Sequence, residues 1–192
     1  GRSGKTFACE YYGITPDFLV LSKQITSSYQ PLAAILLTDA VYQAIADGSQ
    51  KNGAFGHGYT ASGHPVAMAV AIENLKIIEE RGLVANAEKV GAYMQKRLRE
   101  FADHPLVGEV RGVGLIAGVE LVTDKATKAK FDPVGKAGAI YTRKSAENGL
   151  INRAIGDTIC FCPPLIITEA QVDEMIARFS KSLDETAAEL KG

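Results

Sequence analysis

The stretch Phe18-Leu-Val-Leu-Ser-Lys23-Gln-Ile-Thr-Ser-Ser-Tyr-Gln-Pro31-Leu-Ala-Ala decides how the fold of this chain is interpreted. Four apolar residues, Phe18 to Leu21, predict a short buried strand. One lysine, Lys23, stands at the end of this strand, and small hydroxyl residues and a second apolar segment follow it. We therefore expect Lys23 to lie at the mouth of a buried strand.

Burial at a strand mouth would give Lys23 a chemical use. Desolvation disfavours the ammonium form of a lysine. A neutral lysine amine condenses with aldehydes, and this is how lysines serve pyridoxal phosphate. The alternative is that Lys23 points into water, as most lysines do. This window alone favours the alternative, so the choice depends on the rest of the chain.

The composition is that of an ordinary globular chain, with 46% hydrophobic and 22% charged residues among 192. A net charge of −1 gives no footprint for nucleic acid or for an anionic membrane. The apolar runs are far shorter than the roughly 20 residues of a membrane span. Three cysteines without framework spacing favour a reducing compartment. We expect a cytoplasmic protein with no nucleic-acid and no membrane partner.

The chain predicts an α/β fold with three parts. Residues 1–64 have the pattern of the tail of an α/β domain, and residues 65–82 predict a connecting helix that begins at Pro65. Residues 83–192 predict a small α+β domain. The chain opens at Gly1 without an initiator methionine, and we expect it to be the later part of a longer protein.

Each part has its own predicted elements. The first combines strand 18–21, an apolar run over 33–37, a helix over 39–46 that ends at Asp47-Gly48, and a Gly-rich loop over 48–63. The last contains a helix from residue 83, strands 107–111 and 115–121, a helix over 135–148, a hairpin around Gly156-Asp157, and a final helix opened by the capping box Thr168 to Gln171.

Two windows carry candidate binding residues. The segment from Gly58 to Pro65 gathers hydroxyls and backbone donors before a helix N-terminus, which suits either anion binding or ordinary capping. His57 and His64 have no cysteine or carboxylate at ligand spacing, so no metal site is predicted. Arg153 lies in the predicted hairpin, either as a bidentate carboxylate reader or as a surface residue of an edge strand.

Taken together, these windows resemble the class III (omega-) aminotransferases of the pyridoxal-phosphate fold type I group. The resemblance runs from Gly1 to about Leu183. It is closest to the amine/omega-amino acid:pyruvate transaminases, through the spacing from Asn152-Arg153 to Asp157 and Pro163-Pro164. The segments that carry it, in order, are Gly1-Arg-Ser-Gly-Lys-Thr-Phe-Ala, Pro16-Asp17, Ser22-Lys23 to Tyr29-Gln-Pro31-Leu, His57 to Pro65, Arg111-Gly-Val-Gly-Leu, and Pro163-Pro164-Leu165 with Thr168.

The resemblance implies roles for four residues. Lys23 matches the catalytic lysine, which forms the internal aldimine with the cofactor and then shuttles the proton. Thr60 matches the threonine that crosses the dimer interface to hold the partner's cofactor phosphate. Arg153 matches the mobile arginine that swings in for a substrate carboxylate and out for an uncharged amine. Tyr59 would line the neighbouring substrate pocket.

The resemblance also implies the architecture and the reaction. The fold would be the end of the cofactor-binding large domain followed by the small C-terminal domain. The cofactor would be pyridoxal 5′-phosphate, and the amino group of an amine or omega-amino acid would pass to a 2-oxo acid, with pyruvate expected, in a ping-pong reaction. Shared sites imply a homodimer, or a tetramer built from such dimers.

Three family features are expected upstream of Gly1: the aspartate that pairs with the pyridine nitrogen, the glycine/serine phosphate loop and the aromatic that stacks on the ring. Rival readings therefore stay open. Within the family, the chain could belong to an adenosylmethionine-8-amino-7-oxononanoate-type transaminase or, less readily, to a glutamate 1-semialdehyde mutase. In another class, it would be a non-catalytic C-terminal piece that only dimerises.

Overall fold

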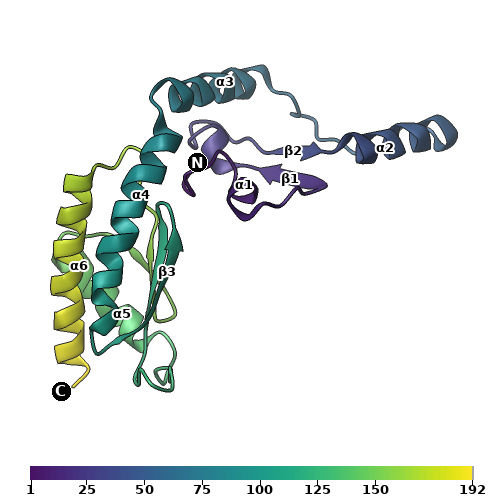
Figure 1. The fold of residues 1–192 in the computed structure, drawn as a ribbon. Helices are drawn as coiled ribbons and strands as arrows, with labels where there is room; N and C mark the ends of the chain where they lie inside the picture. The colour runs from purple at the N-terminus through teal and green to yellow at the C-terminus, as the bar shows by residue number, and fades with distance from the viewer. Residues whose placement is uncertain (192) are drawn as a thin grey trace. The chain divides into compact units, whose positions relative to one another are not determined.

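The computed structural model describes residues 1–191, which fall into two compact units of mixed helix and strand (Figure 1). The first unit joins Gly1–Tyr11 to the chain from Leu83 onward, and the second is Tyr12–Gly82. The helices are α1 (Ala8–Tyr12), α2 (Asp39–Asn52), α3 (Pro65–Glu80), α4 (Leu83–Arg99), α5 (Lys136–Glu147) and α6 (Glu169–Glu189), with the 3-10 turns η1 (Lys23–Ile25) and η2 (Glu100–Asp103). The strands are β1 (Phe18–Leu21), β2 (Ala34–Leu37), β3 (Val107–Val113), β4 (Ile116–Leu121), β5 (Arg153–Ile155) and β6 (Thr158–Phe161).

The first unit is built on an antiparallel sheet of order β3-β4-β6-β5. Burial alternates along β4 and β6, because successive side chains of a strand point to opposite faces. Val119 and Ile159 are fully buried in the core that the sheet shares with α4, α5 and α6. The other face of the sheet is therefore the one that these helices leave open.

Phe179 of α6 lies at the centre of this core. Its ring meets those of Phe101, Tyr141 and Phe161, with centroids 4.9, 5.8 and 5.2 Å away and edge-on geometry in each case. Edge-to-face pairs of this kind add stabilisation beyond the apolar area that they bury. This aromatic cluster thus joins α5, α6 and η2 to strand β6.

The N-terminal segment packs on this first unit. The Leu115 backbone N–H donates to the Arg2 carbonyl oxygen at 2.8 Å, and Lys5 Nζ lies 2.9 Å from Glu88 Oε1. Contacts therefore group residues 1–11 with the C-terminal part, whereas the predicted boundary placed them with residues 12–64. The α3 helix likewise groups with the second unit rather than standing between two domains. Assignment of residues 1–64 to the family's large domain, and of residues 83–192 to its small domain, stays a prediction.

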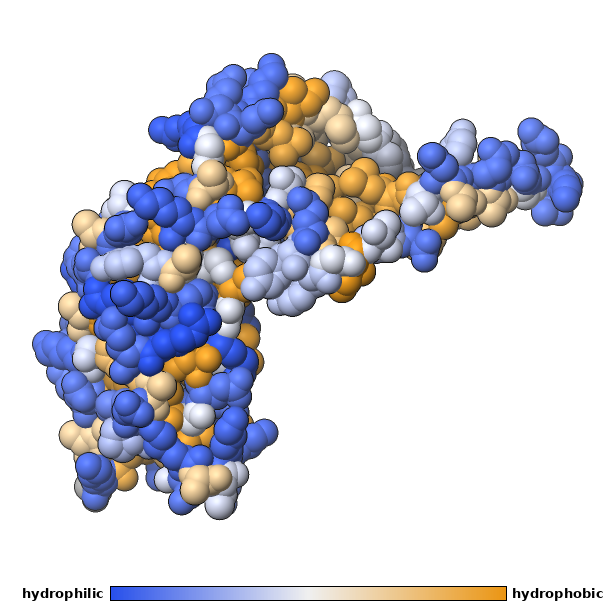
Figure 2. Space-filling view, viewed as in Figure 1, coloured by the Kyte–Doolittle hydropathy of each residue, from blue (hydrophilic) through white to orange (hydrophobic). Residues whose placement is uncertain are grey.

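The second unit is a β1–β2 hairpin with helices α2 and α3. Phe18 pairs with Leu37 and Leu21 with Ala34, in antiparallel register. The prediction of a buried strand is wrong for this chain, because Phe18 is 55% and Val20 69% exposed. A two-stranded sheet does not cover its own faces. Figure 2 shows apolar side chains at the surface over this hairpin and along α3.

Two further predictions concern the positions at which helices end and begin. The predicted end of the helix at Asp47-Gly48 is wrong, because α2 runs through Gly48 to Asn52 and ends at Gly53, whose φ is 89°. A glycine inside a helix costs about 1 kcal/mol, which the surrounding turns here override. The Thr168–Gln171 capping box of α6 is confirmed. No helix within residues 1–191 is long and apolar enough to cross a membrane.

Candidate active site

Lys23 opens the η1 turn directly after β1. Its side chain is exposed, and its Nζ makes no hydrogen bond or ion pair within residues 1–191. The expected desolvation is therefore not supplied by the described part of the chain. The Lys23 backbone has a φ of 53°, which is uncommon for a non-glycine residue. Ser27 and Ser28 share this left-handed backbone, and such strain tends to cluster at functional sites.

The Lys23 loop is held by a residue far along the sequence. Asn74 of α3 donates from Nδ2 to the Gln24 carbonyl oxygen at 2.7 Å, and its Oδ1 accepts from the Ser27 hydroxyl at 2.7 Å. The buried hydroxyl of Thr26 adds a 2.6 Å hydrogen bond to the Gln30 carbonyl oxygen. Asn74 thus fastens the turn on both sides of its apex.

Sequence reasoning missed Asn74, although one signal marked it. Ala67, Ala71 and Asn74 recur at the spacing of one helix face, and the two alanines are buried. Asn74 is half-buried on that face, and its amide offers both a donor and an acceptor to a neighbouring loop. The η1 loop supplies partners for both.

Tyr59 and Thr60 lie in the turn that precedes α3, and both are exposed. The Ser62 hydroxyl accepts from the Tyr59 backbone N–H at 3.2 Å, so this serine closes the turn. The N-cap residue of α3 is His64, which makes no side-chain capping hydrogen bond. His64 therefore does not cap α3 through its side chain, and Thr60 is an exposed residue of the segment that precedes this helix.

Arg153 begins β5, the edge strand of the four-stranded sheet. It is exposed, and its guanidinium has no hydrogen bond or ion pair in the described chain, residues 1–191. Arg153 pairs with Cys160 and Ala154 with the fully buried Ile159. Because alternate residues face opposite sides, Arg153 lies on the open face of the sheet and Ala154 on the helix-covered face.

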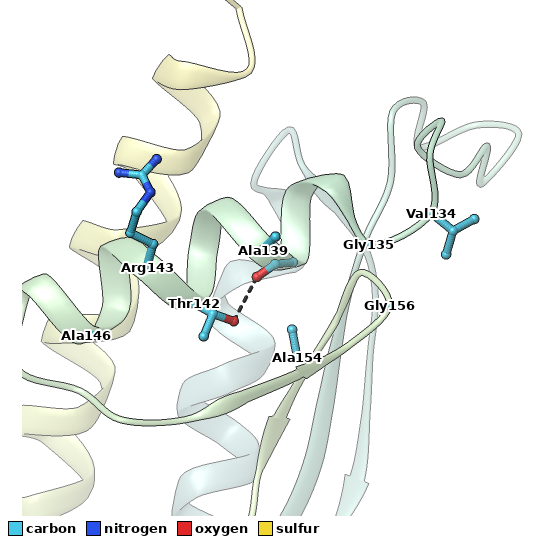
Figure 3. Close-up of a pocket in the computed structure, with 9 residues that line it drawn as sticks. Val134, Gly135, Ala139, Thr142, Arg143, Ala146, Ala154 and Gly156 are labelled. Atoms are coloured by element: carbon cyan, nitrogen blue, oxygen red, sulfur yellow. Dashed lines mark hydrogen bonds between the residues drawn. The ribbon is translucent and has the colours of Figure 1, made fainter.

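The helix-covered side of β5 forms an open groove of about 690 Å³ with α5 (Figure 3). Its walls are small residues of α5, β5 and their flanking loops, together with Thr142 and Arg143. The Thr142 hydroxyl bonds to the Gly138 carbonyl oxygen at 2.8 Å, and Arg143 pairs with Glu189 of α6. These polar groups are satisfied within the domain, and Arg153 is not among the lining residues.

The candidate residues divide between the two units. Lys23, Tyr59 and Thr60 belong to Tyr12–Gly82, and Arg153 belongs to the other unit. The donor set of Tyr12–Gly82 fits part of a pyridoxal-phosphate site, since it offers an exposed amine for an aldehyde and an exposed threonine hydroxyl for a phosphate. The guanidinium of Arg153 suits a planar carboxylate.

Comparison with known proteins gives the family of this chain. Residues 1–183 match the protein family described as Aminotransferase class-III. The chain belongs to the class III aminotransferases, which use pyridoxal phosphate. The resemblance inferred from the motifs and the α/β fold class are thereby confirmed.

Curated relatives act on different amines. The chain is 44% identical to putrescine–pyruvate aminotransferase of Pseudomonas aeruginosa over 98% of its residues, which cover 40% of that protein. It is 43% identical to diaminobutyrate–2-oxoglutarate transaminase of Halomonas elongata, over 96% of the chain and 40% of the relative. The chain thus spans about 40% of the length of these relatives.

Solved structures agree with the fold. A transaminase with L-ala superposes with a TM-score of 0.96 at 57% identity, over 99% of this chain and 45% of that one. The omega transaminase of Pseudomonas jessenii in complex with PMP gives a TM-score of 0.94 at 53% identity, over 98% of this chain and 42% of that one. Both fits extend over nearly every residue of the present chain.

Proposed function

We propose that this chain is the lysine-bearing part of a pyridoxal-phosphate-dependent omega-transaminase, with pyruvate as the amino acceptor. The observation that carries the proposal is the exposed, unpaired Lys23 amine at the strained turn after β1, in a chain whose family match covers residues 1–183. The name of one relative specifies pyruvate, and one similar solved structure contains L-ala, the amino acid that corresponds to pyruvate.

Each candidate residue has a defined task in this proposal. When bound, pyridoxal phosphate supplies the aldehyde that takes the amino group and a ring that withdraws electrons. Lys23 Nζ would take the proton from the substrate carbon that bears the amino group, hold it, and deliver it to the cofactor rather than back to that carbon. The Thr60 hydroxyl donates to a phosphate oxygen in the partner subunit's site, and Tyr59 lines the adjoining substrate pocket. Arg153 binds a substrate carboxylate with two parallel N–H···O bonds.

The role of Thr60 makes the smallest working assembly a homodimer with shared sites, whether alone or within a tetramer. The three cysteines, Cys9, Cys160 and Cys162, are free thiols, and this supports the cytoplasm as the compartment. Neither proposal depends on which amine is the donor.

Borohydride trapping tests the central assignment. The full-length holoenzyme is reduced with borohydride and digested, and the cofactor-modified lysine is mapped by mass spectrometry. A single adduct on Lys23 is expected, because only an amine joined to the cofactor aldehyde is trapped in this way. An adduct at another lysine, or none in an enzyme that binds cofactor, would overturn the assignment of Lys23.

A substrate panel tests the acceptor. Pyruvate, 2-oxoglutarate and a long-chain amino ketone are compared with a simple amine and an omega-amino acid as partners. Preference for pyruvate supports the proposal. Preference for 2-oxoglutarate corrects the acceptor only, and turnover restricted to the amino ketone would assign the chain to the adenosylmethionine-8-amino-7-oxononanoate type. Absence of transamination by a cofactor-loaded enzyme would favour the non-catalytic reading.

A further inference from the structure

The residue before Arg153 is anchored in the core of its domain. Asn152 Nδ2 donates to the Tyr141 phenolic oxygen at 3.0 Å, and Asn152 Oδ1 lies 3.0 Å from the Ser145 hydroxyl. That hydroxyl also lies 2.6 Å from the Leu150 carbonyl oxygen, so the two acceptors share one proton. Tyr141 and Ser145, one turn apart on α5, are both fully buried. The start of β5 is thus tied to the interior of α5.

Burial keeps this network in one protonation state. It raises the pKa of Tyr141, and the hydrogen bonds with Ser145 and Asn152 offset part of that rise. The phenol therefore stays neutral at physiological pH, with its oxygen available to the Asn152 amide.

The turn after β5 is anchored to the same helix from the other side. The Asp157 carboxylate accepts from the Gly135 N–H at 2.7 Å and from the Gly138 N–H at 2.9 Å. Gly135 is the N-cap of α5 and has no side-chain cap of its own, so Asp157 caps this helix from the hairpin. Asp157 is only 7% exposed, which shields these charge-assisted bonds from solvent.

Close packing joins the two anchors. A Cβ at Gly138 would lie 2.0 Å from the Gly156 carbonyl oxygen, so the hairpin approaches α5 as closely as a glycine permits. Ala154, between the anchors, points toward α5 in Figure 3 and lines the groove. The side chains of Asn152 and Ala154 are thus on the α5 side of the strand, and alternation directs Arg153 to the open face.

We propose that Asn152 and Asp157 are positioning residues for Arg153, which clamp both ends of β5 to α5 so that the guanidinium reorients as a side chain on a fixed backbone. This inference rests on the proposed carboxylate-binding role of Arg153. Two parallel hydrogen bonds to a planar carboxylate form only when the backbone that carries the guanidinium is in a defined position. The clamp fixes that backbone position. Substrates without a carboxylate do not use the clamp.

The test compares three clamp variants with a matched control in the full-length holoenzyme. Asn152→Ala and Tyr141→Phe release the first anchor, and Asp157→Asn weakens the second. Tyr141→Phe retains the buried ring, so it separates loss of the hydrogen bond from failure to fold. Thr142→Val is the control, since its hydroxyl bonds within α5 and not to the hairpin. Half-reactions with pyruvate and with an uncharged amine are followed separately, together with hydrogen exchange of the peptide that contains residues 150–158.

Each clamp variant is expected to raise KM for pyruvate by about tenfold, to leave KM for the amine unchanged, and to speed exchange of the β5 peptide. In an Arg153→Ala background, a clamp substitution is expected to cause no further rise in KM for pyruvate, because both changes remove the same interaction. Equal effects on both half-reactions, persistence in that background, or no effect of any clamp variant would overturn the inference.

Failure of the proposed function has a different signature. If wild-type holoenzyme transfers no amino group, or if Arg153→Ala impairs both half-reactions equally, the carboxylate role of Arg153 fails. In that case faster exchange of the β5 peptide would still show the anchoring, but its use in substrate binding would be rejected.

Discussion

The Lys23 loop and the Arg153 hairpin carry the two charged residues that the proposed function uses, and they are supported differently. The Lys23 turn has a strained backbone and is held chiefly by one amide from α3, among exposed neighbours. The Arg153 hairpin is fastened at both ends by buried groups of α5. The backbone position of Arg153 is therefore fixed by the core of its own unit, whereas the Lys23 turn depends on a few hydrogen bonds, two of them to Asn74 of α3.

The largest effect is expected at the less supported region. Lys23→Ala in the holoenzyme should lower turnover by roughly a thousandfold or more, because no other group replaces its amine, while the thermal unfolding midpoint changes little. Formation of alanine from pyruvate measures the loss. Lys51→Ala, an exposed lysine of α2, is the control, and wild-type turnover in Lys23→Ala would refute the catalytic role.

The same substitution, glycine to alanine, should act oppositely on α5, which supports the Arg153 hairpin, and on α2 of the other unit. Gly138→Ala should destabilise the protein by about 2 kcal/mol, since the new methyl group meets the Gly156 carbonyl. Gly48→Ala on α2, where a Cβ meets nothing within 4 Å, should stabilise that helix by up to about 1 kcal/mol. Thermal unfolding with hydrogen exchange over α5 and α2 measures both, and a neutral Gly138→Ala would contradict the close packing.

Asn74→Ala tests the support of the Lys23 turn, as the clamp variants test the support of Arg153. Loss of its two hydrogen bonds to the Lys23 turn should lower kcat by about fivefold and leave KM for pyruvate unchanged, the converse of the clamp variants. Steady-state kinetics with pyruvate distinguish the two patterns. Glu73→Ala, an exposed neighbour on α3, should behave as wild type, and a raised KM with normal kcat would argue against a role for Asn74 at Lys23.

The smallest effect concerns the outer support of α5. The Arg143 guanidinium, followed by Lys144, lowers the pKa of Glu189. A lowered pKa contributes stability above the ordinary carboxyl value and loses it as the pH falls through the folded value. Glu189→Gln should therefore lower the unfolding midpoint slightly at pH 7, by little because the pair is at the surface. The difference should shrink below about pH 4, and a gap that widens in acid would contradict this account.

Local patterns predicted much of this architecture. Four elements were predicted correctly, because each depends on neighbouring residues. They are strand 18–21, the helix that begins at Pro65, the Gly156-Asp157 hairpin and the Thr168–Gln171 capping box. The order of the motifs also identified the family. The exposure of β1 could not be predicted from the sequence. An apolar run indicates that burial would be favourable, but it does not show whether other residues cover the strand.

The residues that hold the candidate site residues in place could not be predicted from local patterns. Asn152 and Asp157 stood beside Arg153 in the sequence without an assigned role, because their partners, Tyr141, Ser145 and the N–H groups of α5, are defined only when the helix packs on the hairpin. Asn74 reaches the Lys23 turn across 50 residues of chain.

The sequence by itself determined the family, the order of the main helices and strands, and the candidates Lys23, Tyr59, Thr60 and Arg153. Motifs and local propensities depend on residues that are close together in the sequence. The tertiary structure alone decided which residues hold them and which face of the sheet Arg153 occupies. Hydrogen bonds and close packing act through space, so a partner many residues away is specified only once the chain has folded.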